Sequence, residues 1–308
     1  MKKRDLMLAL LVVIVWGANF TVIKLGLAGL PPMLLVALRY TFAALPAVFF
    51  IKRPDISWKY IFAYGMAVGV GQFSCLFYAM NIGMPAGTSS VILQSQAFFT
   101  LIFAAVLLKE PLRIFHILGL LIAASGLLLI SGHLGGTGEV SSLPLGALFL
   151  TLLAAAFWGI SNVIVKFASK QAAEQGKTLD MFALVVWSCL VPPLPLYFFA
   201  LLLDTPEALL HIVLNLSGQS IFAILYLSFL ATLVGFGLWS LLLSKYPAGK
   251  VAPLSLLVPI TGLITAQGIL GEQLLPIQWL GCGIIIFGLI ISNFGSAILQ
   301  FFFKGKNI

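Results

Sequence analysis

Long apolar runs separated by short polar connections dominate the chain. Each run has about 20 residues with few charges, which is enough to cross a hydrocarbon core about 30 Å thick. The runs are too long and too evenly apolar for barrel strands, so helices must satisfy the backbone hydrogen bonds in lipid. The pattern therefore predicts ten membrane-spanning helices, at about residues 6–27, 32–51, 58–81, 87–108, 113–131, 146–168, 179–203, 218–243, 250–271 and 276–299.

The second half of the chain repeats the first. Residues 84–127 align without a gap on residues 246–289, and Pro85-Ala86-Gly87 and Glu110 recur as Pro247-Ala248-Gly249 and Glu272. The glycines Gly119 and Gly126 recur as Gly281 and Gly288 at the same spacing of 162, and Trp16, Gly17 and Lys24 recur as Trp158, Gly159 and Lys166 at a spacing of 142. A repeated membrane unit is typical of transporters that hold a small-molecule substrate between two related halves.

Composition places the protein in the lipid bilayer. Hydrophobic residues make up 61% of the chain, charged residues 8%, and the mean hydropathy is +1.13. Such a chain has too little polar surface to cover itself in water. The sequence therefore predicts an all-α polytopic membrane protein, in which the first apolar run is itself a span and not a cleaved signal.

Charge placement predicts the orientation. In the ten-helix arrangement, most basic residues lie at the termini or in connections on one side, which the positive-inside rule makes the cytoplasmic side for both termini. They are Lys2, Lys3, Arg4, Lys52, Arg53, Lys59, Lys109, Arg113, Lys170, Lys177, Lys245, Lys250, Lys304 and Lys306. The net charge of +8 is explained by this topology and by attraction to anionic headgroups, without a nucleic-acid partner.

Five spans is an odd number, so a second copy of a five-helix unit enters the membrane upside down. The expected architecture is two inverted five-helix repeats, residues 1–131 and 146–308, the second ending in a cytoplasmic tail. A Gly- and Ser-rich extracytoplasmic loop, residues 132–145, is expected to join them flexibly. The sequence leaves monomer and homodimer both open.

Several short sequence motifs resemble those of a known family. VVIVWGANFTVIK, ALRY, MPAG, LLKEPL and VAPLSLLVPI follow one another in order across the spans. In this order they resemble the EamA family of the drug/metabolite transporter superfamily over nearly the whole chain, and most closely its bacterial inner-membrane exporters of O-acetylserine and cysteine. The resemblance implies export of small metabolites, such as amino acids or their derivatives, through a central cavity, and a place in the bacterial inner membrane.

Depth in the membrane selects the first candidate substrate residues. Trp16 and Trp158 lie about ten residues, roughly 15 Å, into their helices, too deep for interfacial aromatics. As repeat equivalents they are expected to face a shared cavity, with packing or lipid contact as the alternative. Asn19 and Asn162 follow one turn later and are either substrate ligands or hydrogen-bonding glue between helices.

Arg39 lies about 10 Å into the span 32–51. At that depth its guanidinium either binds a substrate carboxylate or makes a structural or snorkelling contact. Lys24 and Lys166, near span ends, are expected to snorkel to headgroups.

Further candidates come from polar and aromatic faces. Ser90 and Gln94 share a helical face, whereas the repeat equivalent of that helix offers Ser255 among mostly apolar residues, so an asymmetric cavity is expected. Each remaining candidate has core packing as its alternative: Tyr40, Gln72, Tyr78, Phe98, Trp187, Tyr226 and Trp239.

Two prolines and two glycines mark candidate points of bending and close packing. Pro46 and Pro193 recur at a spacing of 147 and predict matched kinks that serve as gates. Gly65 and Gly69 form a GxxxG pattern, which serves either dimerisation or packing within one bundle.

The titratable residues argue against catalysis. Every acidic residue falls in a loop or at a helix end, which favours gradient-driven export, although titration of Lys24 or Lys166 keeps a proton-coupled antiporter open. His116, His133 and His211 sit in separate loops, and the three cysteines form no disulfide or metal pattern. The chain is therefore expected to be no enzyme and to need no metal or cofactor, and its remaining rival function is a broad-specificity exporter of drugs or aromatic compounds.

Overall fold

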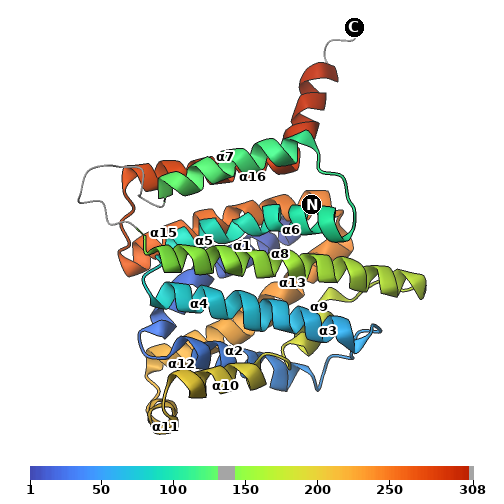
Figure 1. Ribbon diagram of the computed structural model, residues 1–308. Coiled ribbons are helices and arrows are strands. Elements are labelled where there is room, and N and C mark those ends of the chain that lie inside the picture. Colours follow the sequence, from blue (N-terminus) through green and yellow to red (C-terminus); the bar gives the residue numbers. More distant parts are fainter. Residues whose placement is uncertain (131–142, 305–308) are drawn as a thin grey trace.

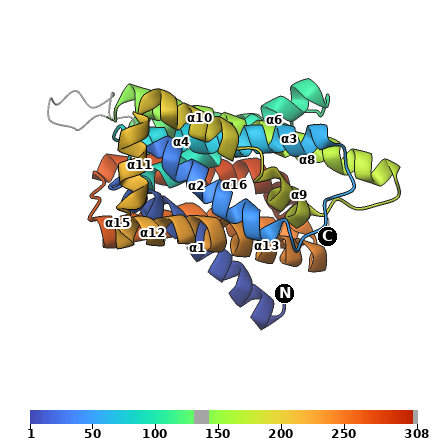
Figure 2. The ribbon, with the colours of Figure 1, turned by 90° about the horizontal axis from the view of Figure 1, so that it is seen from below.

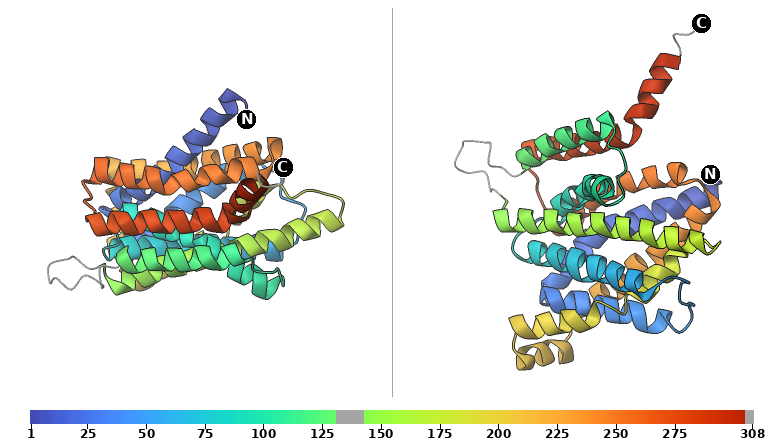
Figure 3. Two further views of the ribbon diagram at one scale, coloured as in Figure 1. Left: turned by 90° about the horizontal axis from the view of Figure 1, so that it is seen from above. Right: turned by 45° about the vertical axis from the view of Figure 1, so that its right-hand side comes forward.

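The computed structural model describes residues 1–130 and 143–304, and these form helices and turns without a strand. His133 and most of the predicted connecting loop lie outside the described residues. In Figure 1 the helices run side by side, and Figure 3 shows the same arrangement from two further directions. The helices of the first half are α1 (Lys3–Leu27), α2 (Pro32–Ala47), α3 (Trp58–Gly65), η1 (Met66–Gln72), α4 (Phe73–Asn81), α5 (Ala86–Ile92), η2 (Leu93–Ser95), α6 (Gln96–Leu107) and α7 (Ile114–Ile130).

The second half follows the same order, except that α9 and α10 stand where the first half has α2 and that a short helix, α11, is added. Its elements are α8 (Leu145–Glu174), α9 (Met181–Ser188), α10 (Pro193–Leu203), α11 (Pro206–Leu214), α12 (Gly218–Leu225), η3 (Tyr226–Val234), α13 (Gly235–Lys245), α14 (Ala248–Val251), η4 (Ala252–Leu257), α15 (Val258–Leu270) and α16 (Pro276–Lys304). Figure 2 shows α11 crossing one end of the bundle, away from the N-terminus.

Seven helices among the described residues are long and apolar enough to cross a membrane. They are Lys3–Leu27, Trp58–Asn81, Ala86–Leu107, Leu145–Glu174, Met181–Leu203, Gly218–Lys245 and Pro276–Gly295. Three further apolar helices, Pro32–Ala47, Ile114–Ile130 and Leu254–Leu270, are shorter. The protein is thus an all-helical, multi-pass membrane protein, as its composition predicts.

The π-helical and 3-10 segments that interrupt the helices recur at the spacing of the sequence repeat. The π-helical segment η1 interrupts the helix 58–81, and the π-helical segment η3 interrupts the helix 218–245. A shift by 162 residues, the spacing between residues 84–127 and 246–289, carries Met66 and Gln72 onto Ser228 and Val234, both inside η3. The 3-10 segment η2 is carried in the same way into η4. The duplication is therefore visible in backbone geometry as well as in residue identity.

Helices α7 and α16 pack against each other through repeated glycines. A Cβ atom on Gly119 would stand 2.5 Å from the Gly288 carbonyl oxygen, and one on Gly126 would stand 2.6 Å from the Gly281 carbonyl oxygen. Only glycine allows this backbone approach. Because Gly119 pairs with Gly288 and Gly126 with Gly281, the two helices run antiparallel and present equivalent faces to each other.

The GxxxG pattern of residues 65–69 is used inside the bundle. A Cβ atom on Gly65 would stand 2.7 Å from the Ser188 carbonyl oxygen, and one on Gly69 would meet the ring of Pro192. These glycines therefore admit the link between α9 and α10, which is the packing alternative to dimerisation.

One end of the bundle gathers the termini and the basic connections. In Figure 1 the N-terminus, the C-terminal end of α16 and the connections that follow α2, α6 and α8 all lie on the right. These segments include Lys2, Lys52, Lys109, Lys177 and Lys304. We call this the basic end; the opposite end carries α11.

Candidate functional site

A cavity of ≈ 420 Å³ lies between the two halves. In the first half its walls come from α1, α2 and the two helices that contain η1 and η2, residues 58–81 and 86–107. In the second half they come from α8, α9 and the two helices that contain η3 and η4, residues 218–245 and 252–270. Irregular backbone at membrane depth is tolerated where it lines a cavity. Ten of the residues singled out from the sequence line this cavity: Trp16, Asn19, Arg39, Gln72, Ser90, Gln94, Trp158, Asn162, Trp239 and Ser255.

The cavity extends towards the basic end. Its lining includes Met181, the first residue of α9, and Leu243, which lies near the end of α13 at Lys245. Towards the opposite end the lining stops earlier, at Phe20 on α1 and Leu76 on α4. The cavity therefore reaches closer to the basic end than to the opposite end.

At the opposite end, Glu272 connects the segment between α15 and α16 to the start of α5. Its two carboxylate oxygens accept hydrogen bonds from the backbone N–H groups of Ala86 at 2.7 Å and Gly87 at 3.0 Å. These groups belong to the first turn of α5, where a negative charge also complements the helix dipole. Nearby, the Lys24 ammonium donates to the Met80 carbonyl oxygen at 2.6 Å.

The repeat equivalents of Glu272 and Lys24 make a different contact at the basic end. There Glu110 and Lys166 form an ion pair with an N–O distance of 2.7 Å, and both side chains are nearly half exposed. Both lysines were expected to snorkel to headgroups. Each instead has a protein partner within reach of its ammonium group.

An aromatic wall from both halves closes one side of the cavity. The Trp16 indole N–H donates to the Ala231 carbonyl oxygen at 3.0 Å. Its ring lies 5.2 Å from the ring of Phe236 and 5.2 Å from that of Trp239, measured between centroids. These tilted contacts stabilise the wall and leave ring surface for a ligand to pack against.

The two cavity asparagines differ in their hydrogen bonds. The Asn162 amide donates to Gln96 Oε1 at 2.8 Å and to Thr100 Oγ1 at 3.0 Å, so it joins α8 to α6. The Asn19 side chain is 7% exposed, and its Oδ1 has no hydrogen-bond partner among the described residues. Gln72 Oε1, in the same cavity, is also without one.

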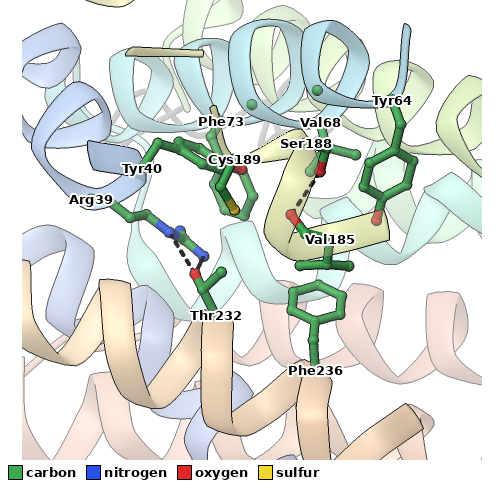
Figure 4. Close-up of a pocket in the computed structure, with 12 residues that line it drawn as sticks. Arg39, Tyr40, Tyr64, Val68, Phe73, Val185, Ser188, Cys189, Thr232 and Phe236 are labelled. Carbon is green, nitrogen blue, oxygen red and sulfur yellow. Dashed lines mark hydrogen bonds between the residues drawn. The ribbon is translucent and has the colours of Figure 1, made fainter. Parts of the chain in front are cut away.

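Arg39 is buried beside this cavity at 2% exposure (Figure 4). Its Nε and Nη2 donate to Thr232 Oγ1 at 3.3 and 3.2 Å, and its guanidinium carbon lies 4.0 Å from the centroid of the Phe73 ring. Its Nη1 has no hydrogen-bond partner, and Arg39 forms no ion pair within the part of the chain that the structure describes. Thr232 thus holds one edge of the guanidinium, whereas Nη1 is buried without a hydrogen-bond partner among the described residues.

Three of the sequence candidates lie off the cavity without a hydrogen bond that explains them. Tyr40 lines a recess of ≈ 10 Å³ behind Arg39, a volume that suits a single water molecule. Phe98 is 4% exposed in the hydrophobic core, and Tyr78 is 37% exposed on the bundle surface.

Two further candidates hold the helices together. The Trp187 indole N–H donates to the Ile51 carbonyl oxygen at 2.9 Å, and the Tyr226 hydroxyl donates to the Val15 carbonyl oxygen at 2.9 Å. Both were singled out as members of polar and aromatic faces, and packing was the alternative for each. In the structure their polar atoms face backbone carbonyls and not the cavity.

The two prolines expected to form matched kinks act differently. Pro193 is the first residue of α10, after the helix breaks at residues 189–192. Pro46 lies in the last turn of α2, which ends at Ala47 instead of continuing to residue 51. Only the second half therefore has a break within the span.

Sequence reasoning missed several residues that shape the site. Thr232 and Phe73 hold Arg39, and neither lies in a polar motif that would have drawn attention. Phe236 and Leu243 line the cavity at three positions before and four after Trp239. Helical spacing from Trp239 would have found these two, whereas the partners of Arg39 come from distant helices.

Comparison with known proteins places the chain among transporters. The model of the EamA-like transporter family matches residues 4–132 and again residues 145–294. A probable amino-acid metabolite efflux pump of Escherichia coli K12 is 40% identical over 296 residues, which cover 96% of each chain. A probable terminal-alkyne amino-acid exporter of Streptantibioticus cattleyicolor is 25% identical over 92% of this chain and 91% of its own.

One solved crystal structure shares the fold. It superimposes with a TM-score of 0.63 at 16% sequence identity, over 97% of this chain and 100% of the other. At that identity the likeness concerns the fold alone.

Proposed function

Because this chain belongs to the EamA-like transporter family of the drug/metabolite transporter superfamily, we propose that it exports amino-acid metabolites across the bacterial inner membrane. A member of this family is a transporter and not an enzyme. The observation that carries the proposal is the cavity between the two halves, which combines buried polar groups with an aromatic wall. Two relatives described as amino-acid exporters support the substrate class.

The proposed topology is ten spans in two inverted repeats, residues 1–131 and 146–308, with both termini in the cytoplasm. The repeated helix irregularities and the antiparallel glycine contact of α7 with α16 support it. The gathering of basic residues at one end supports the orientation. The three shorter apolar helices then span with local thinning of the bilayer.

In this orientation the cavity extends towards the cytoplasm, where an exporter takes up its substrate. Release outside requires the opposite end to part and the basic end to close, which inverted repeats accomplish by exchanging their conformations. The break before Pro193 gives the second half a point at which the helix pair α9–α10 bends. The ten residues that were singled out from the sequence and that line the cavity are the proposed substrate contacts.

Among the described residues that line the cavity there is no carboxylate. We therefore favour export down the substrate gradient over obligatory proton antiport. Within the substrate class, O-acetylserine and cysteine are the proposed cargo, on the strength of the sequence words VVIVWGANFTVIK and VAPLSLLVPI. The aromatic wall of Trp16, Phe236 and Trp239 favours aromatic compounds as the second candidate class.

The test is flux from liposomes that contain the purified full chain. They are loaded with O-acetylserine, cysteine, lysine, phenylalanine, a drug or a lipid-linked compound and measured with and without a pH gradient. We expect efflux of O-acetylserine and cysteine at a rate that the pH gradient leaves unchanged. Efflux of drugs or lipid-linked compounds without any of the amino acids would refute the proposal, and dependence on the gradient would establish antiport.

A further inference from the structure

We propose that the cavity holds a subsite for an α-amino-acid zwitterion, in which Arg39 binds the carboxylate while Asn19 and Gln72 accept from the ammonium group. This inference rests on the proposed function and narrows it, because it requires both charged groups of the substrate to be free. It is argued from three residues that line one cavity, each of which has a buried polar atom without a hydrogen-bond partner among the described residues: Arg39 Nη1, Asn19 Oδ1 and Gln72 Oε1.

Arg39 is a buried cation that calls for an anion. A charge at this depth is destabilising unless it is paired, and the described residues offer it no carboxylate. The Thr232 hydroxyl donates to the Leu227 carbonyl oxygen at 2.8 Å, so its oxygen faces Arg39 as an acceptor and holds Nε and Nη2. This leaves Nη1 to bind a substrate carboxylate oxygen, with the charge of the guanidinium strengthening the bond.

Asn19 and Gln72 supply the opposite chemistry. Their side chains are 7% and 3% exposed, and each has an oxygen acceptor without a partner. Leaving a buried acceptor unpaired is unfavourable by an amount comparable to a lost hydrogen bond. An ammonium group carries three donors and no acceptor, so it satisfies two such oxygens at once.

The three groups come from the first half only, on α1, α2 and η1. The aromatic surfaces come from both halves, from Trp16 on α1 and from Trp158, Phe236 and Trp239 in the second half. The subsite therefore assigns the shared head group of amino acids to the first half and places the variable side chain against the aromatic surfaces. Such a division accommodates several amino acids while it excludes amines and simple acids.

The experiment compares ligands before it compares variants. Binding of O-acetylserine, cysteine, leucine and phenylalanine to the purified full chain is measured by ligand-induced thermal stabilisation, beside the carboxamide and the N-acetyl derivative of each. We expect the free amino acids to bind about tenfold more tightly than either derivative, the size of a lost hydrogen bond to a charged group. Equal affinity for the carboxamides would overturn the assignment of Arg39, and equal affinity for the N-acetyl forms would overturn that of Asn19 and Gln72.

Variants then assign each preference to a side chain. In Arg39→Gln the preference over the carboxamide falls below about twofold, and Arg39→Lys restores part of it because the charge remains without the second donor edge. In Asn19→Leu the preference over the N-acetyl form is lost. The matched controls are Arg113→Gln in a connection and Asn293→Leu on α16, where the amide bonds the Leu289 carbonyl oxygen; neither residue lines the cavity, and both preferences persist.

The two proposals fail in different ways. If the wild-type chain prefers free amino acids in binding but exports none of them from liposomes, the subsite stands and the export function fails. If it exports amino acids and their carboxamides equally well, the function stands and the subsite fails. The wild-type comparison needs no variant, so it decides the question even where Arg39→Gln does not fold.

Discussion

The two ends of the bundle carry the same residues in different contacts. At the end opposite to the basic connections, half-buried Glu272 binds the first backbone N–H groups of α5. At the basic end its repeat equivalent, Glu110, is exposed and pairs with Lys166. Residues made equivalent by duplication therefore have different partners at the two ends, backbone N–H groups for Glu272 and an exposed lysine for Glu110.

The α7–α16 contact is where the two halves remain alike, and we expect the largest effect there. Gly281→Leu should lower the free energy of unfolding by about 1–3 kcal/mol because its side chain would press on the Gly126 carbonyl oxygen. Gly119→Leu should match it, since Gly119 is the repeat equivalent of Gly281 and a Cβ atom there would stand 2.5 Å from the Gly288 carbonyl oxygen. Thermal unfolding of the purified protein measures both.

Gly283→Leu is the control for that pair, because a Cβ atom on Gly283 meets nothing within 4 Å and lies on the exposed side of α16. It should leave the melting temperature unchanged. If Gly119→Leu and Gly281→Leu differed as much as either differs from this control, the symmetric contact would be refuted.

The second effect separates the two ends. Glu272→Gln weakens two charge-assisted hydrogen bonds at the end opposite to the basic end. We expect it to increase the population in which this end is open about tenfold. A cysteine at buried Thr88, in a chain without the native cysteines, reports this opening by its rate of labelling from outside with an impermeant maleimide.

Glu110→Gln is the comparison, because an exposed ion pair contributes about 0–1 kcal/mol. It should leave the labelling of Thr88→Cys nearly unchanged or lower it. Equal acceleration by both variants would show that Glu272 has no special part in closing its end.

The smallest effect concerns the two asparagines. Asn162→Leu removes hydrogen bonds between α8 and α6 and should lower the free energy of unfolding by about 0.6 kcal/mol. Asn19→Leu removes an amide whose oxygen has no protein partner, so stability should stay the same or rise while substrate binding weakens. Chemical denaturation and ligand binding on the same preparations test this division; a loss of stability in Asn19→Leu would point to a structural role.

Many cavity-lining residues could be predicted, because the depth of a residue in its span and its repeat equivalent can both be read from the sequence. Trp16, Trp158 and Asn19 were found by counting residues from a span boundary, and all three line the cavity. Tyr226 and Trp187 were singled out as polar aromatics within predicted spans, yet their donors bind the backbone carbonyl oxygens of Val15 and Ile51. Depth predicts that a polar group needs a partner, but it does not say whether that partner is protein or ligand.

The sequence by itself determined that the chain is a helical membrane protein, that its halves are copies and that most basic residues share one side. Apolar length, residue identity and charge are properties of the chain that no packing changes. Only the tertiary structure decided which equivalent residues differ: that the Asn162 amide has partners whereas Asn19 Oδ1 has none among the described residues, and that Glu272 binds backbone N–H groups while Glu110 pairs with Lys166. Two copies of one sequence unit share their local preferences, but a transporter caught in a single state cannot give both copies the same neighbours.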